Sequence, residues 1–357
     1  MSFVQYEAEI RSKKSVLTQL HGLIDWEDLS HILGKLGRSG FGPTGYEPIK
    51  LLKALLLGGW HSLSDVQLEE ALRDRMSFIH FTGFDGQVPD ATTLCRFRNL
   101  LVEKKKIKQI FKAIQRNFES KGITVKPADK AIVDATIIAS AARPTTVMDF
   151  EDAIKLPDEL EDEDAQPNDC EDDTIEANEE KIDPKPSRVC ADPDARWLKK
   201  GKELHFGYRL HTICDSDGLV HDFHLTPANV SEVTQLESVM GDIRPRRLYA
   251  DKGYASRSNH NMLSEKGIKS GILKKAARNR PLTKLERIFN RIASKTRTVV
   301  ERVFAITKRI LRYRRASYMG IRKVEYECGM KLIAHNGLKA VRKISREINL
   351  NLGRSCA

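Results

Sequence analysis

The sequence contains no long hydrophobic run. Its longest apolar-rich stretch, residues 51–60, is interrupted by Lys53 and includes a glycine pair near its end. A membrane-spanning helix needs roughly 18 to 20 predominantly apolar residues. The first 14 residues mix acidic and basic side chains without an apolar centre, unlike a secretory signal. We therefore expect no membrane partner and a cytoplasmic location.

Cysteine is scarce, and no cysteine pair has the spacing of metal ligands. The six cysteines stand singly, without a CxxC motif, which argues against a disulfide framework and a cysteine zinc site. A predicted hairpin carries His205, His211, His221 and His224, but their spacing matches no zinc motif. The sequence also lacks a glycine-rich phosphate loop, so it predicts no nucleotide cofactor.

Acidic residues are concentrated in one segment and sparse elsewhere. The chain has 60 Lys and Arg against 49 Asp and Glu, but residues 149–180 hold 16 acids and one base, Lys155. The other 325 residues therefore carry a net charge of +26. A body this basic predicts a polyanionic partner, and nucleic acid is the commonest candidate.

The acidic segment, at about residues 149–186, includes four prolines and has little periodicity. This composition predicts a disordered insertion. It is either a solvated spacer or a DNA mimic that folds back on the basic body.

Residues 1–127 are predicted to form an all-α domain. Pro48 opens one helix, and Ser64 with Gln67 forms a capping box for the next. A third helix, capped by Asp90 or Thr92, is expected to continue through the basic residues 104–106. Such a domain binds DNA ends, dimerises or does both; the alternative is that it only packs against the rest of the chain.

Residues 128–340 are predicted to form a mixed α/β domain, followed by a C-terminal tail at 341–357. Residues 130–139 are nearly continuously apolar, as in a strand covered on both faces. Alternating runs at 205–214 and 219–226 flank an Asp-Gly turn, which predicts a hairpin. A helix at 231–240 capped by Ser231, a short strand from 247 and a basic helical region at 282–348 follow.

Two carboxylates fall on apolar strands. Asp134 lies among isoleucines and valine, where an unpaired carboxylate is costly unless a cation compensates it. Alternatively, Asp134 caps a neighbouring loop. Asp251 directly follows a second short apolar strand. Carboxylates at the ends of two core strands can converge on a hard cation such as Mg²⁺.

A third carboxylate is expected from a later helix. At about 100° per residue, Arg297, Glu301 and Lys308 share one helical face, beside an apolar stripe. Glu301 is one of two acids between residues 269 and 323, against 18 Lys and Arg. The alternative is an ordinary surface ladder of charges.

These segments together resemble the DDE transposases of bacterial insertion sequences, which have an RNase H-like catalytic core and a helical N-terminal region. The motifs that carry the resemblance span most of the chain: residues 89–93 with Arg96 and Arg98, residues 133–136, 207–211, 215–218, 225–232 and 250–254, and the Arg297, Glu301, Lys308 spacing. The fold that the resemblance implies is a mixed sheet flanked by helices.

The resemblance implies that Asp134, Asp251 and Glu301 are the catalytic residues and bind Mg²⁺, which Mn²⁺ can replace. The side chains expected to contact DNA are Arg297, Lys308, Lys252, Tyr254, Arg96, Arg98 and Trp197. The expected partners are double-stranded DNA, as terminal inverted repeats and as target, and further copies of the chain in a homodimer or larger oligomer at the bacterial nucleoid. Ser294 departs from the pattern, which has tyrosine there.

Two other functions remain open at this point. A nuclease with the same fold would cut DNA without joining it, and a strand-transfer assay separates the two. The other alternative is a DNA-binding descendant without catalytic activity. The three acidic residues argue against it, because such a protein would not need carboxylates in a basic groove.

Overall fold

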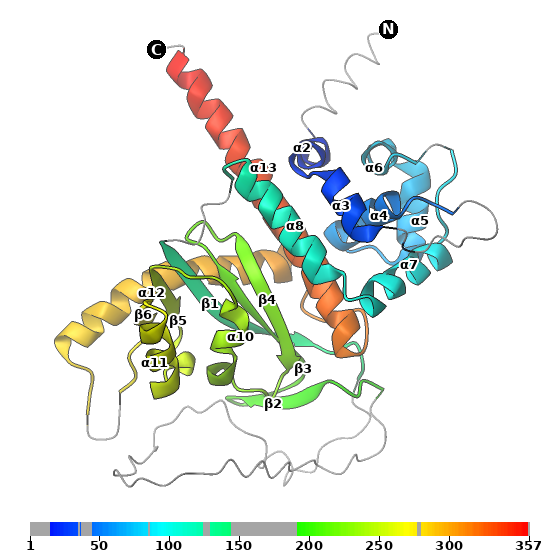
Figure 1. Ribbon diagram of the computed structural model, residues 1–357. Helices are drawn as coiled ribbons and strands as arrows, with labels where there is room; N and C mark the ends of the chain where they lie inside the picture. The colour runs from blue at the N-terminus through cyan, green and yellow to red at the C-terminus, as the bar shows by residue number, and fades with distance from the viewer. Residues whose placement is uncertain are drawn as a thin grey trace.

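The computed structural model describes residues 15–34, 36, 45–84, 86–123, 129–143, 191–276 and 280–355. The predicted acidic insertion lies outside these residues. A mixed sheet flanked by helices forms one part of the molecule, and a cluster of helices from the N-terminal region forms the other (Figure 1). The predicted mixed α/β class with a helical N-terminal region is confirmed. No helix within the described ranges is long and apolar enough to cross a membrane.

The N-terminal cluster consists of short helices that bury leucine and phenylalanine side chains against one another. They are α2 (Val16–Leu23), α3 (Trp26–Leu33), α4 (Pro48–His61), α5 (Asp65–Asp74), α6 (Met76–Thr82), α7 (Ala91–Glu103) and α8 (Ile107–Ser120). The capping box predicted at Ser64 and Gln67 is present, and Asp90 caps α7 through the N–H of Thr93.

The prediction that the third helix continues through residues 104–106 is wrong. The helix α7 ends at Glu103, and α8 begins at Ile107. Lys105 adopts a left-handed backbone conformation with φ 49°, which breaks a right-handed helix. The break turns the chain so that α8 packs its apolar face against α13 and strand β4.

The sheet has the strand order β2-β3-β1-β5-β6, and β4 pairs with β3. Its strands are β1 (Lys130–Ala139), β2 (Arg196–Lys200), β3 (Glu203–Cys214), β4 (Val220–Pro227), β5 (Arg247–Ala250) and β6 (Lys269–Ile272). The predicted strand at 130–139 and the β3–β4 hairpin are confirmed. Since β1, β5 and β6 are parallel, their carboxyl ends meet at one edge.

Helices cover both faces of the sheet. On one face, Ile132 and Tyr249 belong to the core shared with α12 (Lys284–Ala305), α13 (Ile321–Ser355) and the N-terminal helices. On the other face, Val133 and Leu248 pack with α10 (Leu236–Met240) and α11 (Arg257–Glu265). Because side chains alternate along a strand, Asp134 lies on the same face as Ile132, beneath α12.

Two predicted helices are divided. The helix at 231–240 consists of a 3₁₀ turn, η1 (Glu232–Gln235), followed by α10, and the Ser231 side chain makes no capping hydrogen bond. The helical region at 282–348 contains α12, a π-helical turn η3 (Ile306–Ile310), a non-helical stretch and α13. The predicted tail has no structural boundary, because α13 continues through residue 340.

In Figure 1, α13 runs between the helical cluster and the sheet, beside α8. Lys331 on α13 is 5% exposed and donates to Gly59 O at 2.8 Å, Ser62 Oγ at 2.9 Å and Leu311 O at 3.0 Å. This ammonium group therefore joins the end of α4 to the chain that follows η3. Burial lowers the pKa of Lys331 to about 8.

We expect this lysine to make the folding stability depend on alkaline pH. Between about pH 8 and pH 10.5 the unfolded chain binds the proton that the folded chain has lost, so stability rises with pH in this window. The slope from one group is at most about 1.4 kcal/mol per pH unit. Urea unfolding at several pH values should show a steeper rise for the wild type than for Lys331→Met. The exposed Lys112→Met is the control, and equal slopes in all three proteins would contradict the expectation.

Candidate active site

The first two predicted carboxylates lie at the carboxyl edge of the parallel strands. The register pairs Lys130 with Arg247 and Ile132 with Tyr249, so Asp134 and Asp251 are at the same level of adjacent strands. The Asp134 side chain is 14% exposed and that of Asp251 is 37% exposed. Asp134 also accepts a hydrogen bond from the N–H of Ala135 at 2.9 Å.

Arg297 on α12 bridges the two carboxylates. Its Nη2 lies 3.0 Å from Asp134 Oδ2, and its Nη1 lies 3.1 Å from Asp251 Oδ1. Its Nε is buried and has no hydrogen-bond partner among the described residues. The guanidinium thus holds residues that are 163 and 46 positions away in sequence and retains one unsatisfied donor.

The electrostatics of the site favour a bound cation. Burial raises the pKa of Asp134, while the Arg297 charge opposes this shift and the nearby Asp251 adds to it. Two carboxylates this close repel each other unless a positive charge lies between them. Their oxygens are also the donors that hard divalent cations prefer. The site therefore fits a divalent metal ion by its donor chemistry, with Arg297 supplying the compensating charge in the structure.

The third predicted carboxylate does not join the first two. Glu301 lies one helical turn beyond Arg297 on α12 and is exposed. Within the described ranges, no three His, Cys, Asp or Glu side chains are arranged to hold a metal ion. The structure thus brings together Asp134, Asp251 and Arg297, and leaves Glu301 near the end of the same helix.

The remaining predicted contact residues occupy different environments. Lys308 is half-buried on the π turn η3, where burial and then the neighbouring Lys200 and Arg314 lower its pKa. Lys252 is exposed on η2 (Lys252–Tyr254), directly after Asp251. Arg96 is exposed on α7.

The two aromatic residues expected to contact DNA both pack against other side chains of the fold. The Tyr254 ring is fully buried in the core shared with α10 and α11, and its hydroxyl has no hydrogen-bond partner among the described residues. Trp197 on β2 is half-buried and packs against Phe206, with ring centroids 5.2 Å apart. The buried Tyr254 ring has no free face of the kind that base stacking uses, whereas Trp197 is partly exposed and its DNA contact stays a prediction.

Arg98 is buried in the N-terminal cluster, where the sequence predicts a DNA contact. Its Nη1 and Nη2 lie 2.6 Å and 2.7 Å from the two carboxylate oxygens of Asp65, and its guanidinium stacks over Tyr318. This bidentate pair connects α7 with the first turn of α5. The arginine is therefore engaged in holding helices together.

We expect Arg98→Met to lower the free energy of unfolding by about 3 kcal/mol, because it leaves the Asp65 carboxylate without its partner. The double variant Arg98→Met/Asp65→Leu should recover much of this loss in urea unfolding, since it removes both charges. Unchanged stability of Arg98→Met together with weaker DNA binding would favour the phosphate contact instead.

A buried ion pair behind the site was not identified from the sequence. Arg209 on β3 lies 3.5 Å from Glu232 on η1, and their side chains are 2% and 17% exposed. Glu232 also lies against Gly253, directly behind the turn that follows Asp251. Both residues fall within motifs named above, but only the folded arrangement pairs them. The pair supports the turn that positions Asp251.

Comparisons with known proteins match two regions of the chain to transposase families. A family profile described as "Transposase DDE domain" matches residues 181–336, and one described as "Transposase domain (DUF772)" matches residues 4–100. Asp134 lies between the two matched regions. The chain is 35% identical over 251 residues to the transposase for insertion sequence element IS1106 of Neisseria meningitidis serogroup B, covering 70% of this chain and 78% of that protein. No solved structure matches the chain.

Proposed function

The chain belongs to the DDE transposases of bacterial insertion sequences, which are metal-dependent DNA-cleaving enzymes, and we propose that it performs both cutting and joining. In this proposal it binds the ends of its element, hydrolyses a phosphodiester there and joins the freed 3′-OH to target DNA. The observation that carries the proposal is the convergence of Asp134 and Asp251 on Arg297 at one edge of the sheet.

We propose that Asp134, Asp251 and Glu301 hold two Mg²⁺ ions, which Mn²⁺ can replace. When bound, such ions activate water and offset the charge that develops on the attacking and leaving oxygens. The two aspartates support this assignment by their position and their acceptor chemistry. Glu301 is the available third carboxylate, since it lies one turn beyond Arg297 on the helix that covers both aspartates.

The side chains around the carboxylates would position the DNA. We propose that Arg297 and Lys308 hold backbone phosphates and that Lys252 contacts the strand beside Asp251. The unsatisfied Nε of Arg297 supports this role, because a phosphate oxygen would complete its hydrogen bonding. Phosphoryl transfer asks mainly for positioning and charge neutralisation, which these groups supply.

We also propose that the helices within residues 1–127 bind the element ends, dimerise, or do both, while residues 128–340 carry catalysis. The exposed Arg96 on α7 is a candidate for the end contact. The expected assembly on DNA is a homodimer or a larger homo-oligomer, with terminal inverted repeats and target DNA as partners. Since the proposed substrate is DNA, we expect the enzyme to act at the bacterial nucleoid.

A strand-transfer assay tests the joining step. A duplex that carries the element's own terminus with a free 3′-OH is incubated with a supercoiled plasmid, Mg²⁺ and the protein. We expect a product in which the duplex is covalently attached to the plasmid. A parallel reaction with an uncut terminus measures cleavage. Cleavage there without a joined product in either reaction would identify a nuclease, and binding without cleavage or joining would identify a non-catalytic descendant.

A further inference from the structure

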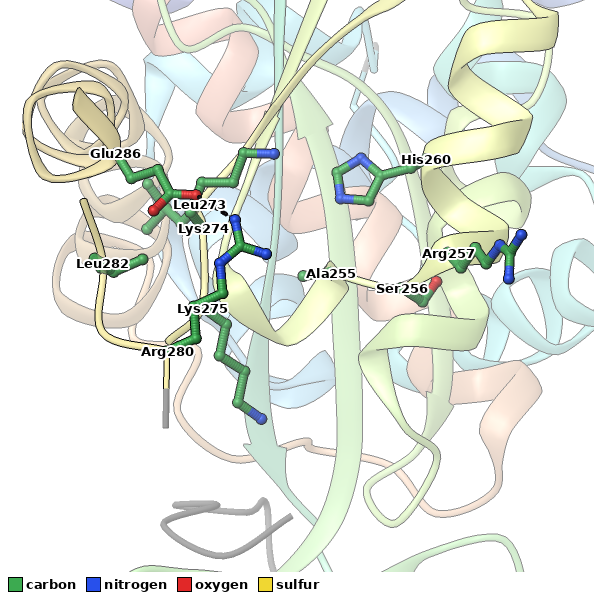
Figure 2. Close-up of a pocket in the computed structure, with 10 residues that line it drawn as sticks. All are labelled: Ala255, Ser256, Arg257, His260, Leu273, Lys274, Lys275, Arg280, Leu282 and Glu286. Carbon is green, nitrogen blue, oxygen red and sulfur yellow. Dashed lines mark ion pairs between the residues drawn. The ribbon is translucent and has the colours of Figure 1, made fainter. Parts of the chain in front are cut away.

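A second cluster of charged side chains lies toward the start of α12, in a pocket of about 360 Å³. This volume is at the lower end of the roughly 300 to 1,000 Å³ typical of ligand pockets. Its walls come from the start of α11, the connection between β6 and α12, and the first turn of α12 (Figure 2). We call it the basic pocket. The charged and titratable residues that line it are Arg257, His260, Lys274, Lys275, Arg280 and Glu286.

The charges of the basic pocket are mostly positive. Figure 2 shows Lys274, Lys275 and Arg280 between α12 and α11, with His260 facing them from α11 and Arg257 turned outward at the rim. Burial, and to a lesser extent Lys274, lowers the pKa of His260. An imidazole ring offers at least one hydrogen-bond donor whether it is neutral or charged. A concave site lined by one sign of charge concentrates counter-ions.

Glu286, the one acid among the lining residues that the structure describes, is engaged in capping its own helix. Its Oε2 accepts the N–H of Thr283 at 2.9 Å, and its Oε1 lies 3.8 Å from Arg280. This carboxylate therefore completes the capping box of α12 and offsets part of one arginine charge. The pocket retains a net positive charge from its lysines and arginines.

The framework of the pocket is fixed by hydrogen bonds to α12. Asn290 Oδ1 accepts the N–H of Lys274 at 2.8 Å, and its Nδ2 donates to the Lys274 carbonyl at 2.9 Å. Leu273 N–H donates to the Ala250 carbonyl at 3.1 Å, which continues the pairing between β5 and β6. The backbone that carries Lys274 is thus held at the same sheet edge as Asp251.

The distance between the pocket and the aspartates can be expressed as a length along α12. Glu286 and Arg297 are 11 residues apart on α12, which corresponds to about 16 Å along the helix axis. Phosphates on one strand of duplex DNA advance about 3.4 Å each along the duplex axis. A strand that follows α12 would therefore place a phosphate in the pocket about five nucleotides from the one at Asp134 and Asp251.

We propose that the basic pocket binds a backbone phosphate of the DNA, about five nucleotides from the bond that is cut. This inference rests on the proposed function, since it takes DNA to be the substrate that lies on this edge. The pocket adds a sequence-independent contact, separate from Arg297 and Lys308, that fixes the register of the strand over the carboxylates.

Salt dependence of binding tests the proposal. The affinity for a 30-base-pair duplex of unrelated sequence is measured by fluorescence anisotropy at several salt concentrations, without divalent metal so that cleavage plays no part. For Lys274→Ala/Arg280→Ala we expect the log–log slope to become shallower by about 0.9, the value for one lost phosphate contact, with about 8-fold weaker binding at 0.1 M salt. Lys274→Ala/Lys275→Ala, which leaves the Arg280–Glu286 pair intact, should give a similar change and an unchanged melting temperature.

A matched control removes two charges from the opposite sheet edge. Arg246 and Lys269 are exposed and lie at the starts of β5 and β6, away from Asp251. We expect Arg246→Ala/Lys269→Ala to retain the wild-type slope. An equal loss in the control, or a wild-type slope in both pocket variants, would overturn the proposal. Because metal is absent, a failure of cleavage or joining leaves this result unaffected.

Two further measurements locate the contact and identify its source. On a duplex with the element's terminus, a neutral methylphosphonate about five nucleotides from the cut should weaken wild-type binding and have no further effect on Lys274→Ala/Arg280→Ala. Additive losses of affinity would overturn the assignment.

Calorimetry with pyrophosphate and with ATP should show no saturable binding in the micromolar range. Micromolar binding that the double variant loses would identify a free anion as the ligand instead of DNA.

Discussion

Asp134→Asn is expected to lower the rate of metal-dependent cleavage at element ends by about a thousandfold or more. The substitution keeps the shape of the side chain and removes the negative charge that, with Asp251, would hold a metal ion. A metal ion contributes several kcal/mol to the stabilisation of charge in the transition state, and about 4 kcal/mol corresponds to a thousandfold in rate. Cleavage of a labelled terminal duplex in Mg²⁺ measures the effect.

Asp129→Asn is the matched control, because Asp129 precedes the same strand at the opposite sheet edge and pairs with Arg246. It should cleave at the wild-type rate. Asp251→Asn and Glu301→Gln should show the same loss as Asp134→Asn, while all three variants still bind DNA. Glu301→Gln is the most informative of them, since Glu301 is apart from the aspartates in the structure. A variant that cleaves normally would be removed from the metal-binding set.

Arg297→Lys is expected to reduce cleavage by about 100-fold, although it preserves the positive charge. Arg297 contacts Asp134 and Asp251 through two different nitrogens, whereas a lysine presents a single point charge. A displacement of about 1 Å in a site of this kind can cost about a hundredfold in rate. Salt titrations should show a nearly normal slope of DNA binding for this variant, which separates geometry from charge.

Arg297→Ala should also change metal binding in the absence of DNA. The guanidinium and a divalent cation compete for the same carboxylate oxygens, so its removal should tighten the binding of Mn²⁺ observed by electron paramagnetic resonance. Thr298→Ala, one residue further along α12 and exposed, is the control. Weaker Mn²⁺ binding by Arg297→Ala would show that the arginine supports the metal site and does not compete with it.

The strands of the sheet that are most buried were the easiest to predict. The apolar run at 130–139 and the Asp-Gly turn after Cys214 carry local signals, and both elements form as expected. The strand β2 lacked such a signal because it is short and carries Arg196, Lys199 and Lys200. Charged residues of this kind are common on edge strands, where they oppose pairing with other chains.

The helix α11 was missed although Ser256 caps it locally by accepting the N–H of Asn259. Asn259 stabilises it by donating to the carbonyls of Val233 and Tyr254. The hydrophobic pattern of residues 257–265 does not indicate these hydrogen bonds.

The interruption of the basic helical region depends on packing against α13. Tyr313, which follows the π turn, is buried against Cys328 of that helix.

Some residues of the candidate site could be predicted from the sequence near them, and others only from contacts that form in the fold. Apolar strands pointed to Asp134 and Asp251, and a shared helical face with Arg297 and Lys308 pointed to Glu301. The resemblance to a family then implied a catalytic role for all three. The bridging position of Arg297 depends on residues from three elements, so no local pattern contains it. Arg98 was expected to contact DNA because it lies in a motif shared with the family. That motif does not show that Asp65, 33 residues earlier in the sequence, pairs with Arg98 in the fold.

The π turn at Ile306–Ile310 makes this part of the chain sensitive to its length. Leu311 N–H donates to the carbonyl of Ile306, five residues earlier, so the turn holds one residue more than an α-helical turn. Deleting one residue between Glu301 and Lys308 would rotate Lys308 by about 100° around the helix axis relative to Glu301. A natural variant shortened by one codon here would keep its helix and lose the alignment of its charges.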